Sequence, residues 1–500
     1  MGIEVETTGG VVEGFEDEGA LVFRGIPYAE PPLADLRFRA PEPPRPWRGV
    51  RDATRFGASP PQLELSVDFL PGMEVGEQSE DCLVLNLATP ACDAAARPVL
   101  VFLHGGGFTI GSGSQPMYDP RALARRGDAL VVTLSYRLGA LGFLHLDEIA
   151  GRAFGAEGNA GLLDQVAALR WVKANAAAFG GDPRRVTIFG ESAGGMSVAT
   201  LLALPAAGGL FQGAIAQSGA AHNVHDAAGA TRVAAELLAE LGAPASRLRD
   251  LPVERILEAQ ARVLARHRGD PQLLLPFQPV VDGRVLPTPP LEALRRGAAG
   301  GVPVLIGTTR DEFAILGRLQ RGLERLDAAG LAERVRARVG DERAPALLAA
   351  YREALPDASP AALFDALETD RLFRIPALRL EQALREGGSR TFLYLFTWES
   401  VFFGGRLGAC HGIELPFVFG AIGSKAGDAF AGGGPEAQEL AARVMDAWAA
   451  FARRGEPGHA GLPEWPACDA ERRATMLLGP TCALARAPEE ARRRAWEGLL

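Results

Sequence analysis

The sequence predicts an α/β fold in which helices cover both faces of a central, mostly parallel sheet. Two observations predict it: short apolar runs alternate with longer helical patterns, and these runs are apolar throughout, as strands buried on both faces are. In addition, 47% of the 500 residues are hydrophobic and 23% are charged, which indicates a large core and excludes disordered and fibrous proteins.

The first half of the chain contains a predicted strand, helix, strand unit. Residues 159–179 carry apolar side chains at helical spacing and end at a Gly-Gly-Asp-Pro stop signal. Buried strands are expected at 98–103, 129–135, 185–189, 279–281 and 304–307. From about 226 to 385 the chain is rich in Ala, Leu and Arg with interleaved acidic residues, which predicts helical insertions over the sheet. Length alone leaves two to four domains or one large unit open.

Charge and segment composition limit the partners and the compartment. Lys plus Arg number 52 and Asp plus Glu number 61, a net charge of −9, so nucleic acid and anionic membranes are not expected as partners. The first six residues contain neither a basic region nor an apolar run, and no apolar window of 18 residues follows. Five scattered cysteines are expected to be free thiols. The sequence therefore predicts a cytoplasmic protein without a membrane span.

A serine at the end of a predicted strand has the setting of a catalytic nucleophile. Residues 190–194, Gly-Glu-Ser-Ala-Gly, follow an apolar strand and precede a helical pattern, as in a nucleophile elbow with Ser192 at its tip. Small residues are needed around so sharp a turn. An ordinary serine in a glycine-rich turn is the alternative, and the flanking strand and helix favour the nucleophile.

Serine chemistry also needs hydrogen-bond donors for the oxyanion that forms in the reaction. A predicted strand ends in His-Gly-Gly-Gly-Phe at 104–108, and the N–H groups of Gly106, Gly107 and Ala193 are the candidate donors. The glycines could alternatively form a plain turn or a dinucleotide-binding loop. Their spacing differs by one residue from the Gly-x-Gly-x-x-Gly pattern of dinucleotide-binding loops. His222 and His225 are spaced like a helical metal pair without further ligands, so no metal is expected.

Together these segments resemble the carboxylesterase type B family of α/β-hydrolases, which also contains the cholinesterases. The matching segments lie in the family's order at 23–32, 79–86, 104–108, 159–165, 180–195, 217–219, 279–283, 307–312 and 410–420. The resemblance spans nearly the whole chain and implies the α/β-hydrolase fold as a single catalytic domain over 1–500. It also implies a serine carboxylesterase that forms an acyl-enzyme intermediate and uses no cofactor.

The resemblance also assigns the remaining site residues. It implies Glu312 as the acid of the catalytic triad, although the residues alone leave Asp311 nearly equal, and His411 as the base. Glu191 and Ser218 are implied as supporting residues close to the nucleophile. Arg37 and Glu80 are identified with a buried ion pair of the family, expected to be structural. Cys82 lacks the partner that it has in secreted relatives, which agrees with a reducing compartment.

Several expectations concern activity. The expected substrate is a small-molecule ester, and the alternatives are an amide or carbamate hydrolase of the same fold and a noncatalytic binding module. The oligomeric state is undetermined, and a monomer is compatible with the sequence. Activity is expected to rise with an ionisation near pH 6 to 7. The three glycines predict a roomy oxyanion site, which a methyl group added at Gly106 would narrow.

Overall fold

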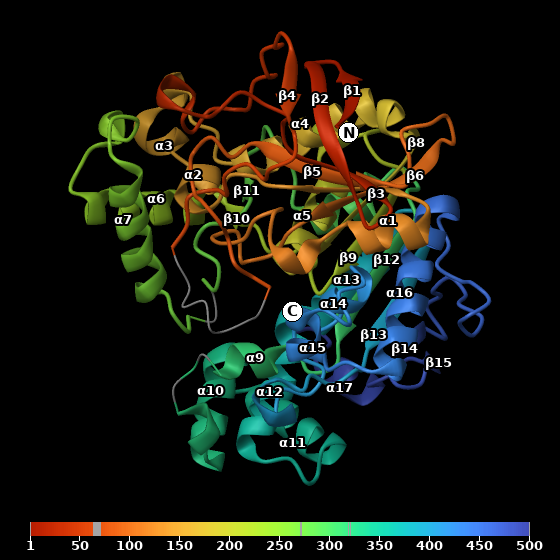
Figure 1. Ribbon diagram of the computed structural model, residues 1–500. Coiled ribbons are helices and arrows are strands. Elements are labelled where there is room, and N and C mark those ends of the chain that lie inside the picture. The colour runs from red at the N-terminus through yellow and green to blue at the C-terminus, as the bar shows by residue number, and fades with distance from the viewer. Residues whose placement is uncertain (1, 64–71, 271–272, 319, 321, 500) are drawn as a thin grey trace.

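The central sheet has the arrangement that the sequence predicts. The computed structural model describes residues 2–63, 72–270, 273–318, 320 and 322–499. Its strands are β1 (Ile3–Thr7), β2 (Gly10–Asp17), β3 (Ala20–Pro27), β4 (Val50–Asp52), β5 (Val84–Thr89), β6 (Arg97–Leu103), β7 (Leu130–Leu134), β8 (Gly181–Glu191), β9 (Gly213–Gln217), β12 (Val304–Thr309), β13 (Thr391–Phe396), β14 (Ala474–Leu478) and β15 (Ala483–Arg486). Figure 1 shows this sheet through the middle of the molecule with helices on both sides.

The direction of the strands separates the middle of the sheet from its edges. The order is β1-β2-β3-β5-β7-β6-β8-β9-β12-β13-β14-β15, with β4 beside β2. All neighbours from β7 to β14 in this order are parallel. The path from β1 to β7 and the final pair β14/β15 are antiparallel. The predicted α/β fold with a mostly parallel sheet flanked by helices is therefore confirmed.

Alternating side chains of the buried strands form two layers of core. In β6, Val99, Val101 and Leu103 pack into one layer, which includes the apolar faces of the helices α4 (Ala160–Asn175) and α5 (Ala193–Ala203). Leu100 and Phe102 point to the opposite layer, with α1 (Arg121–Gly127) and α16 (Pro435–Arg454). Both layers are apolar, so the strand is hydrophobic throughout instead of alternating.

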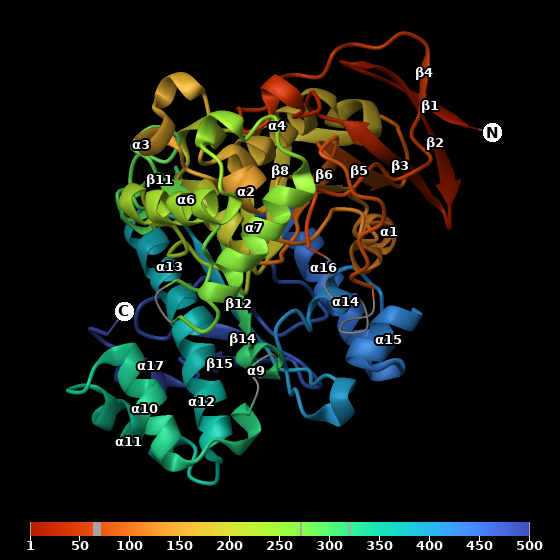
Figure 2. The ribbon, with the colours of Figure 1, turned by 90° about the vertical axis from the view of Figure 1, so that its left-hand side faces the viewer.

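Helices fill most of the predicted insertion region. The remaining helices are α2 (Gly139–Phe143), α3 (Asp147–Ala150), α6 (Ala227–Leu241), α7 (Val253–Arg266), α8 (Pro290–Arg295), α9 (Phe313–Arg318), α10 (Ala328–Val339), α11 (Ala344–Ala354), α12 (Pro360–Thr369), α13 (Ile375–Glu386), α14 (Leu415–Val418), α15 (Lys425–Ala431) and α17 (Glu490–Ala495). Figures 1 and 2 both place α10, α11 and α12 together at one end of the molecule. These three helices share a small core of their own, which includes Leu331, Tyr351 and Phe364.

One predicted strand lies outside the central sheet. Residues 279–281 were expected as a buried strand, and β11 (Val280–Val281) does form there. It pairs only with β10 (His225–Asp226), however, in a separate two-stranded sheet. The side chain of Asn159 holds this strand in place, because its Oδ1 accepts from the Val280 N–H at 2.8 Å and its Nδ2 donates to the Val280 carbonyl at 2.9 Å.

The parallel strands bring distant parts of the chain to one edge of the sheet. Because β6, β8 and β12 run in the same direction, the loops that follow their carboxyl ends meet there. These loops are the glycine-rich segment after β6, the serine turn after β8 and the Asp-Glu pair after β12. Among the described helices, none combines the length and the apolar character needed to cross a bilayer. All five cysteines are free thiols, as expected.

Candidate active site

Ser192 occupies a sharp turn between β8 and α5, as the elbow motif predicts. Its backbone has φ 56° and ψ −122°, a conformation that residues other than glycine rarely adopt. Its N–H donates to the Gln217 carbonyl at 2.9 Å. Only glycine fits two positions later, because a Cβ on Gly194 would lie 1.9 Å from the Leu103 carbonyl oxygen. The turn therefore holds the serine at the end of the sheet.

The glycine-rich loop after β6 has a fixed shape. Gly106 has φ +107°, and its carbonyl accepts hydrogen bonds from the N–H groups of Thr109 and Ile110, both at 3.1 Å. The carbonyl of His104, just before the glycines, accepts a hydrogen bond from the Tyr136 hydroxyl at 2.8 Å. The imidazole of His104 also stacks on the Tyr136 ring, with 4.4 Å between the ring centroids. Backbone held in this way can present N–H groups to a ligand without reorganising.

The N–H groups of the three expected oxyanion donors have no hydrogen-bond acceptor within the described residues. Within the described chain, the N–H groups of Gly106 and Gly107 donate no hydrogen bond. Ala193 is the first residue of α5, so its N–H has no partner within the helix. The loop contacts the nucleophile, since a Cβ on Gly105 would lie 3.1 Å from the Ser192 Cβ.

A methyl group at Gly106 would meet the loop itself. A Cβ on Gly106 would lie 2.2 Å from the Ile110 carbonyl oxygen. Alanine there would distort the loop for every ester. A Cβ on Gly107 would point toward Leu275, 3.4 Å from its Cδ2. Leu275 therefore lies over the loop and is the side chain that limits room at this glycine.

His411 pairs with Glu312 and not with Asp311. The His411 Nδ1 lies 2.6 Å from the Glu312 Oε2, and the fully buried glutamate also accepts the Thr309 N–H at 2.8 Å. Asp311 is half-buried and accepts the Ala409 N–H at 2.8 Å, which holds together the two loops that carry the pair. Glu312 thus orients the imidazole, as a triad acid does.

A second carboxylate lies at the other side of the imidazole. The Glu191 Oε1 is 3.1 Å from the His411 Nε2, the nitrogen that a serine hydroxyl would use, but it accepts no hydrogen bond. Among the described residues, no hydrogen bond joins the Ser192 hydroxyl to His411. Such contacts are often loose in an enzyme without substrate and tighten in the complex.

The surrounding carboxylates control the charge of the imidazole. Burial lowers the pKa of His411, but Glu191 and Glu312 outweigh burial and raise that pKa above its usual value. Burial raises the pKa of Glu191, which His411 partly opposes. The carboxylates that face His411 therefore place its pKa above the range of 6 to 7 that an ordinary histidine suggests, and we expect the rise of activity at correspondingly higher pH.

Comparisons with known proteins agree with this geometry. A model of the carboxylesterase family matches residues 2–496. The chain belongs to the carboxylesterase family. The para-nitrobenzyl esterase of Bacillus subtilis is 40% identical over 98% of this chain and 97% of its own length. The phenmedipham hydrolase of Pseudarthrobacter oxydans is 38% identical over 95% and 94%. The crystal structure of a Geobacillus stearothermophilus carboxylesterase has a TM-score of 0.88 at 40% identity and covers 99% of both chains.

These matches decide the class of enzyme. The relatives match nearly the full length of this chain, and their fold is that of the α/β-hydrolases. The chain is a serine carboxylic-ester hydrolase of this family. A noncatalytic binding module does not agree with the full-length match to these hydrolases.

Two residues of this carboxylesterase site were not predicted. The Phe373 ring lies 4.7 Å from the His411 ring, and no local motif marks it, because it comes from a distant π-helical turn (Asp370–Arg374). Glu414 is fully buried, and burial together with Glu191 and Glu312 raises its pKa. Glu414 could have been recognised from the sequence as a residue near the site, because it lies only three positions after His411.

The other residues that the sequence analysis singled out make structural contacts. Ser218 is buried at the end of β9, between β8 and β12, where its N–H donates to the Gly307 carbonyl at 2.8 Å. The ion pair of Arg37 and Glu80 is confirmed, with the Arg37 Nε 2.7 Å from the Glu80 Oε2. Arg37 also donates to the Leu251 carbonyl at 2.6 Å, which supports a structural role. The His225 Nε2 bonds to the Pro276 carbonyl at 3.0 Å.

Replacing the acid should be far more damaging than replacing its neighbour. We expect Glu312→Gln to lower kcat by roughly 10³- to 10⁴-fold, because the amide no longer stabilises the imidazolium or fixes its tautomer. Asp311→Asn should cost roughly tenfold or less, since this side chain holds a loop and does not touch the imidazole. Steady-state rates on one nitrophenyl ester check this. A larger loss for Asp311→Asn would move the triad acid to Asp311.

Proposed function

We propose that this enzyme hydrolyses carboxylic esters through an acyl-enzyme on Ser192, with His411 as base and Glu312 as triad acid. The N–H groups of Gly106, Gly107 and Ala193 serve as the oxyanion hole. The observation that carries the proposal is the 2.6 Å contact of His411 with Glu312 at the edge of the sheet where the Ser192 turn lies.

The reaction follows from these positions. The Ser192 Oγ attacks the ester carbonyl while the His411 Nε2 takes the proton of the serine hydroxyl. The oxyanion that forms accepts hydrogen bonds from the three N–H groups. The tetrahedral intermediate collapses, and His411 returns the proton to the leaving alcohol. Water then attacks the acyl-enzyme by the same steps in reverse and releases the carboxylic acid and the free serine.

Glu191 competes with Ser192 for the imidazole. At 3.1 Å from Nε2, its carboxylate stabilises the charged form of His411, which cannot act as a base. A neutral residue at this position would remove the attraction and lower the pKa of His411, so Nε2 would be available as a base at lower pH. Burial opposes the charge on Glu191 and raises the pKa of this carboxyl to about 7, so the carboxylate that faces Nε2 is the form present above neutral pH.

This competition predicts the pH profile of a Glu191→Gln variant. Removing the carboxylate lowers the pKa of His411, so the rise of kcat/KM with pH should move to lower pH by about one unit. The exposed Glu148 lies outside the site, and Glu148→Gln is the matched control, with no displacement expected. Profiles from pH 5 to 10 provide the measurement. An unmoved midpoint in Glu191→Gln would show that Glu191 does not control the base.

The proposed substrates are small-molecule esters, and the proposed location is the cytoplasm. The net charge of −9 supports neither nucleic acid nor an anionic membrane as partner. The relatives are named for a para-nitrobenzyl ester and for phenmedipham, both small molecules. Free cysteines, Cys82 among them, support a reducing compartment. We propose that a monomer is sufficient, because the serine, acid, base and oxyanion donors all come from one chain.

A substrate panel tests this function. It contains p-nitrophenyl esters of increasing acyl length together with an anilide and a carbamate of matched acyl size. We expect kcat/KM to be highest for an ester. The anilide should be slower because an amine is a poorer leaving group than an alcohol, and the carbamate should be slower because its nitrogen makes the carbonyl less electrophilic. A preference for the anilide or the carbamate would favour the alternative of an amide or carbamate hydrolase.

A further inference from the structure

Arg374 is a buried cation with too few partners. Only 6% of its surface is exposed, yet its Nε and Nη1 have no hydrogen-bond partner among the described residues. Its Nη2 donates one long bond, 3.5 Å, to the Arg310 carbonyl. The carboxylate of Asp370 lies 3.5 Å from the Arg374 Nε but is already held by Arg492 at 2.8 and 2.9 Å. A buried guanidinium of this kind is costly unless an acceptor reaches it.

The Arg374 side chain lines a pocket on the far side of β12 from the nucleophile turn. The pocket lies between strands β12 to β14, the start of α13 and the segment that leads into α17, and it has a cavity volume of about 40 Å³. Its apolar lining includes Ala377, Leu378, Leu393 and Leu395. Ser192, His411 and Phe373 do not line it.

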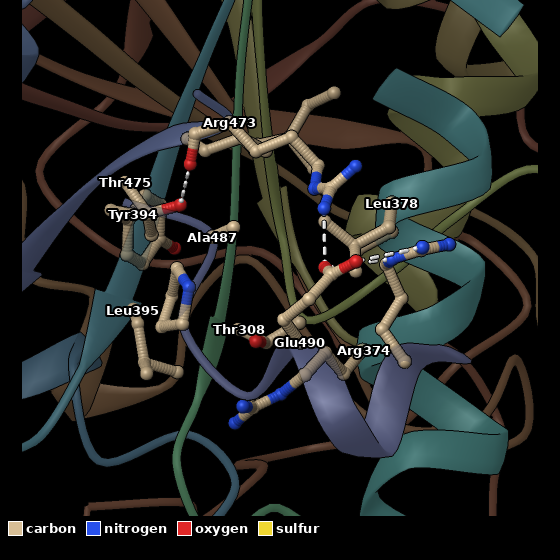
Figure 3. A pocket seen from close by; sticks show the side chains of 15 residues that line it. Thr308, Arg374, Leu378, Tyr394, Leu395, Arg473, Thr475, Ala487 and Glu490 are labelled. Atoms are coloured by element: carbon tan, nitrogen blue, oxygen red, sulfur yellow. Dashed lines mark hydrogen bonds and ion pairs between the residues drawn. The ribbon is translucent and has the colours of Figure 1, made fainter. Parts of the chain in front are cut away.

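The charges of the pocket favour an anion. Its lining contains three arginines and one glutamate, and Glu490 is bonded to both Arg473 and Arg493. In Figure 3, Arg473 reaches Glu490, whereas the Arg374 side chain runs away from that carboxylate. Among the arginines that line the pocket, Arg374 is thus the one whose Nε and Nη1 have no hydrogen-bond acceptor within the described residues.

We propose that this pocket binds a small carboxylate with a short apolar chain, its head group on the Arg374 guanidinium and its chain against Leu378 and Leu393. A carboxylate supplies the acceptors that Nε and Nη1 lack, and a charge-assisted bond of this kind is strong in a buried site. The apolar lining favours a carboxylate with a hydrocarbon chain over an inorganic anion. The site is separate from the ester-hydrolysing centre and does not depend on its mechanism.

Equilibrium dialysis with radiolabelled hexanoate at constant ionic strength tests the proposal. We expect Arg374→Gln to weaken binding by about tenfold or more, because a hydrogen-bonded charge pair is lost. Arg379→Gln is the matched control, since this arginine lies on the same helix, α13, and does not line the pocket. Leu378→Trp keeps the cation and fills the pocket, so it should also abolish binding. Equal binding by the wild type, Arg374→Gln and Leu378→Trp would overturn the proposal.

Two further arms separate the site from other sources of binding. Hexanol tests the apolar chain alone, and sulfate tests the charge alone; equal binding of either would overturn the proposed ligand class. Enzyme whose nucleophile has been blocked with diethyl p-nitrophenyl phosphate should still bind hexanoate in an Arg374-dependent way. Loss of this binding in the blocked enzyme would assign the hexanoate to the catalytic centre. If the phosphate forms no adduct, the proposed mechanism fails, and the dialysis results on Arg374 still stand.

Discussion

Ser192→Ala should lower kcat by roughly 10⁴- to 10⁶-fold while leaving the fold intact. The change removes the hydroxyl that forms the acyl-enzyme and adds no atom, because serine already carries a Cβ at φ 56°. Stopped-flow and steady-state assays on a nitrophenyl ester measure the loss, and thermal unfolding checks the fold.

Ser197→Ala is the matched control for this prediction. Ser197 is also buried on α5, where its hydroxyl accepts a bond from the Gln165 amide at 3.1 Å, and it should retain near wild-type activity. A Ser192→Ala enzyme that kept a tenth of the wild-type rate would contradict the assignment of the nucleophile. An equal loss of activity in Ser197→Ala would also contradict this assignment, because it would indicate that the substitutions act by damaging helix α5.

His411→Ala should be about as inactive as Ser192→Ala, and the double variant should be little worse than either. The reason is that the base and the nucleophile act as a unit: without His411 the Ser192 proton has no acceptor, and without Ser192 the base has no proton to take. Rates of both single variants and the double variant on one ester give the comparison. His459→Ala is the control, since that ring bonds to the Arg443 carbonyl away from the site.

The pattern of the three rates distinguishes the alternatives. If His411 and Ser192 acted independently, their losses would multiply in the double variant. That outcome would mean that His411 contributes by another route, such as packing against Phe373.

Local patterns were sufficient for the parts of the site that depend on local sequence. The strand, turn and helix around Ser192 and the glycines before Phe108 are continuous segments whose backbone needs can be recognised from residue types. The predicted strands at 98–103, 129–135, 185–189 and 304–307 correspond to β6, β7, β8 and β12. Each is buried on both faces, which makes its apolar run unambiguous.

Contacts between distant segments could not be predicted in this way. Glu312 and His411 are 99 residues apart, and the choice of Glu312 over Asp311 rested on family resemblance. The structure supplies the physical reason, since the Thr309 N–H and the His411 ring both face Glu312. Neither Phe373 nor the effect of Glu191 on His411 leaves a local signal. The antiparallel strands β1 to β3 are likewise partly exposed and carry mixed residues, so they lack the pattern of a buried strand.

The central claim is that Ser192 carries the acyl group, and mass spectrometry after reaction with diethyl p-nitrophenyl phosphate tests it most directly. This reagent transfers a phosphoryl group to an activated serine and releases p-nitrophenol. We predict one adduct per chain, located in the peptide that contains Ser192, with no adduct in Ser192→Ala and a greatly slowed reaction in His411→Ala. An adduct on any other residue of the wild-type enzyme, or the same adduct in Ser192→Ala, would contradict the account.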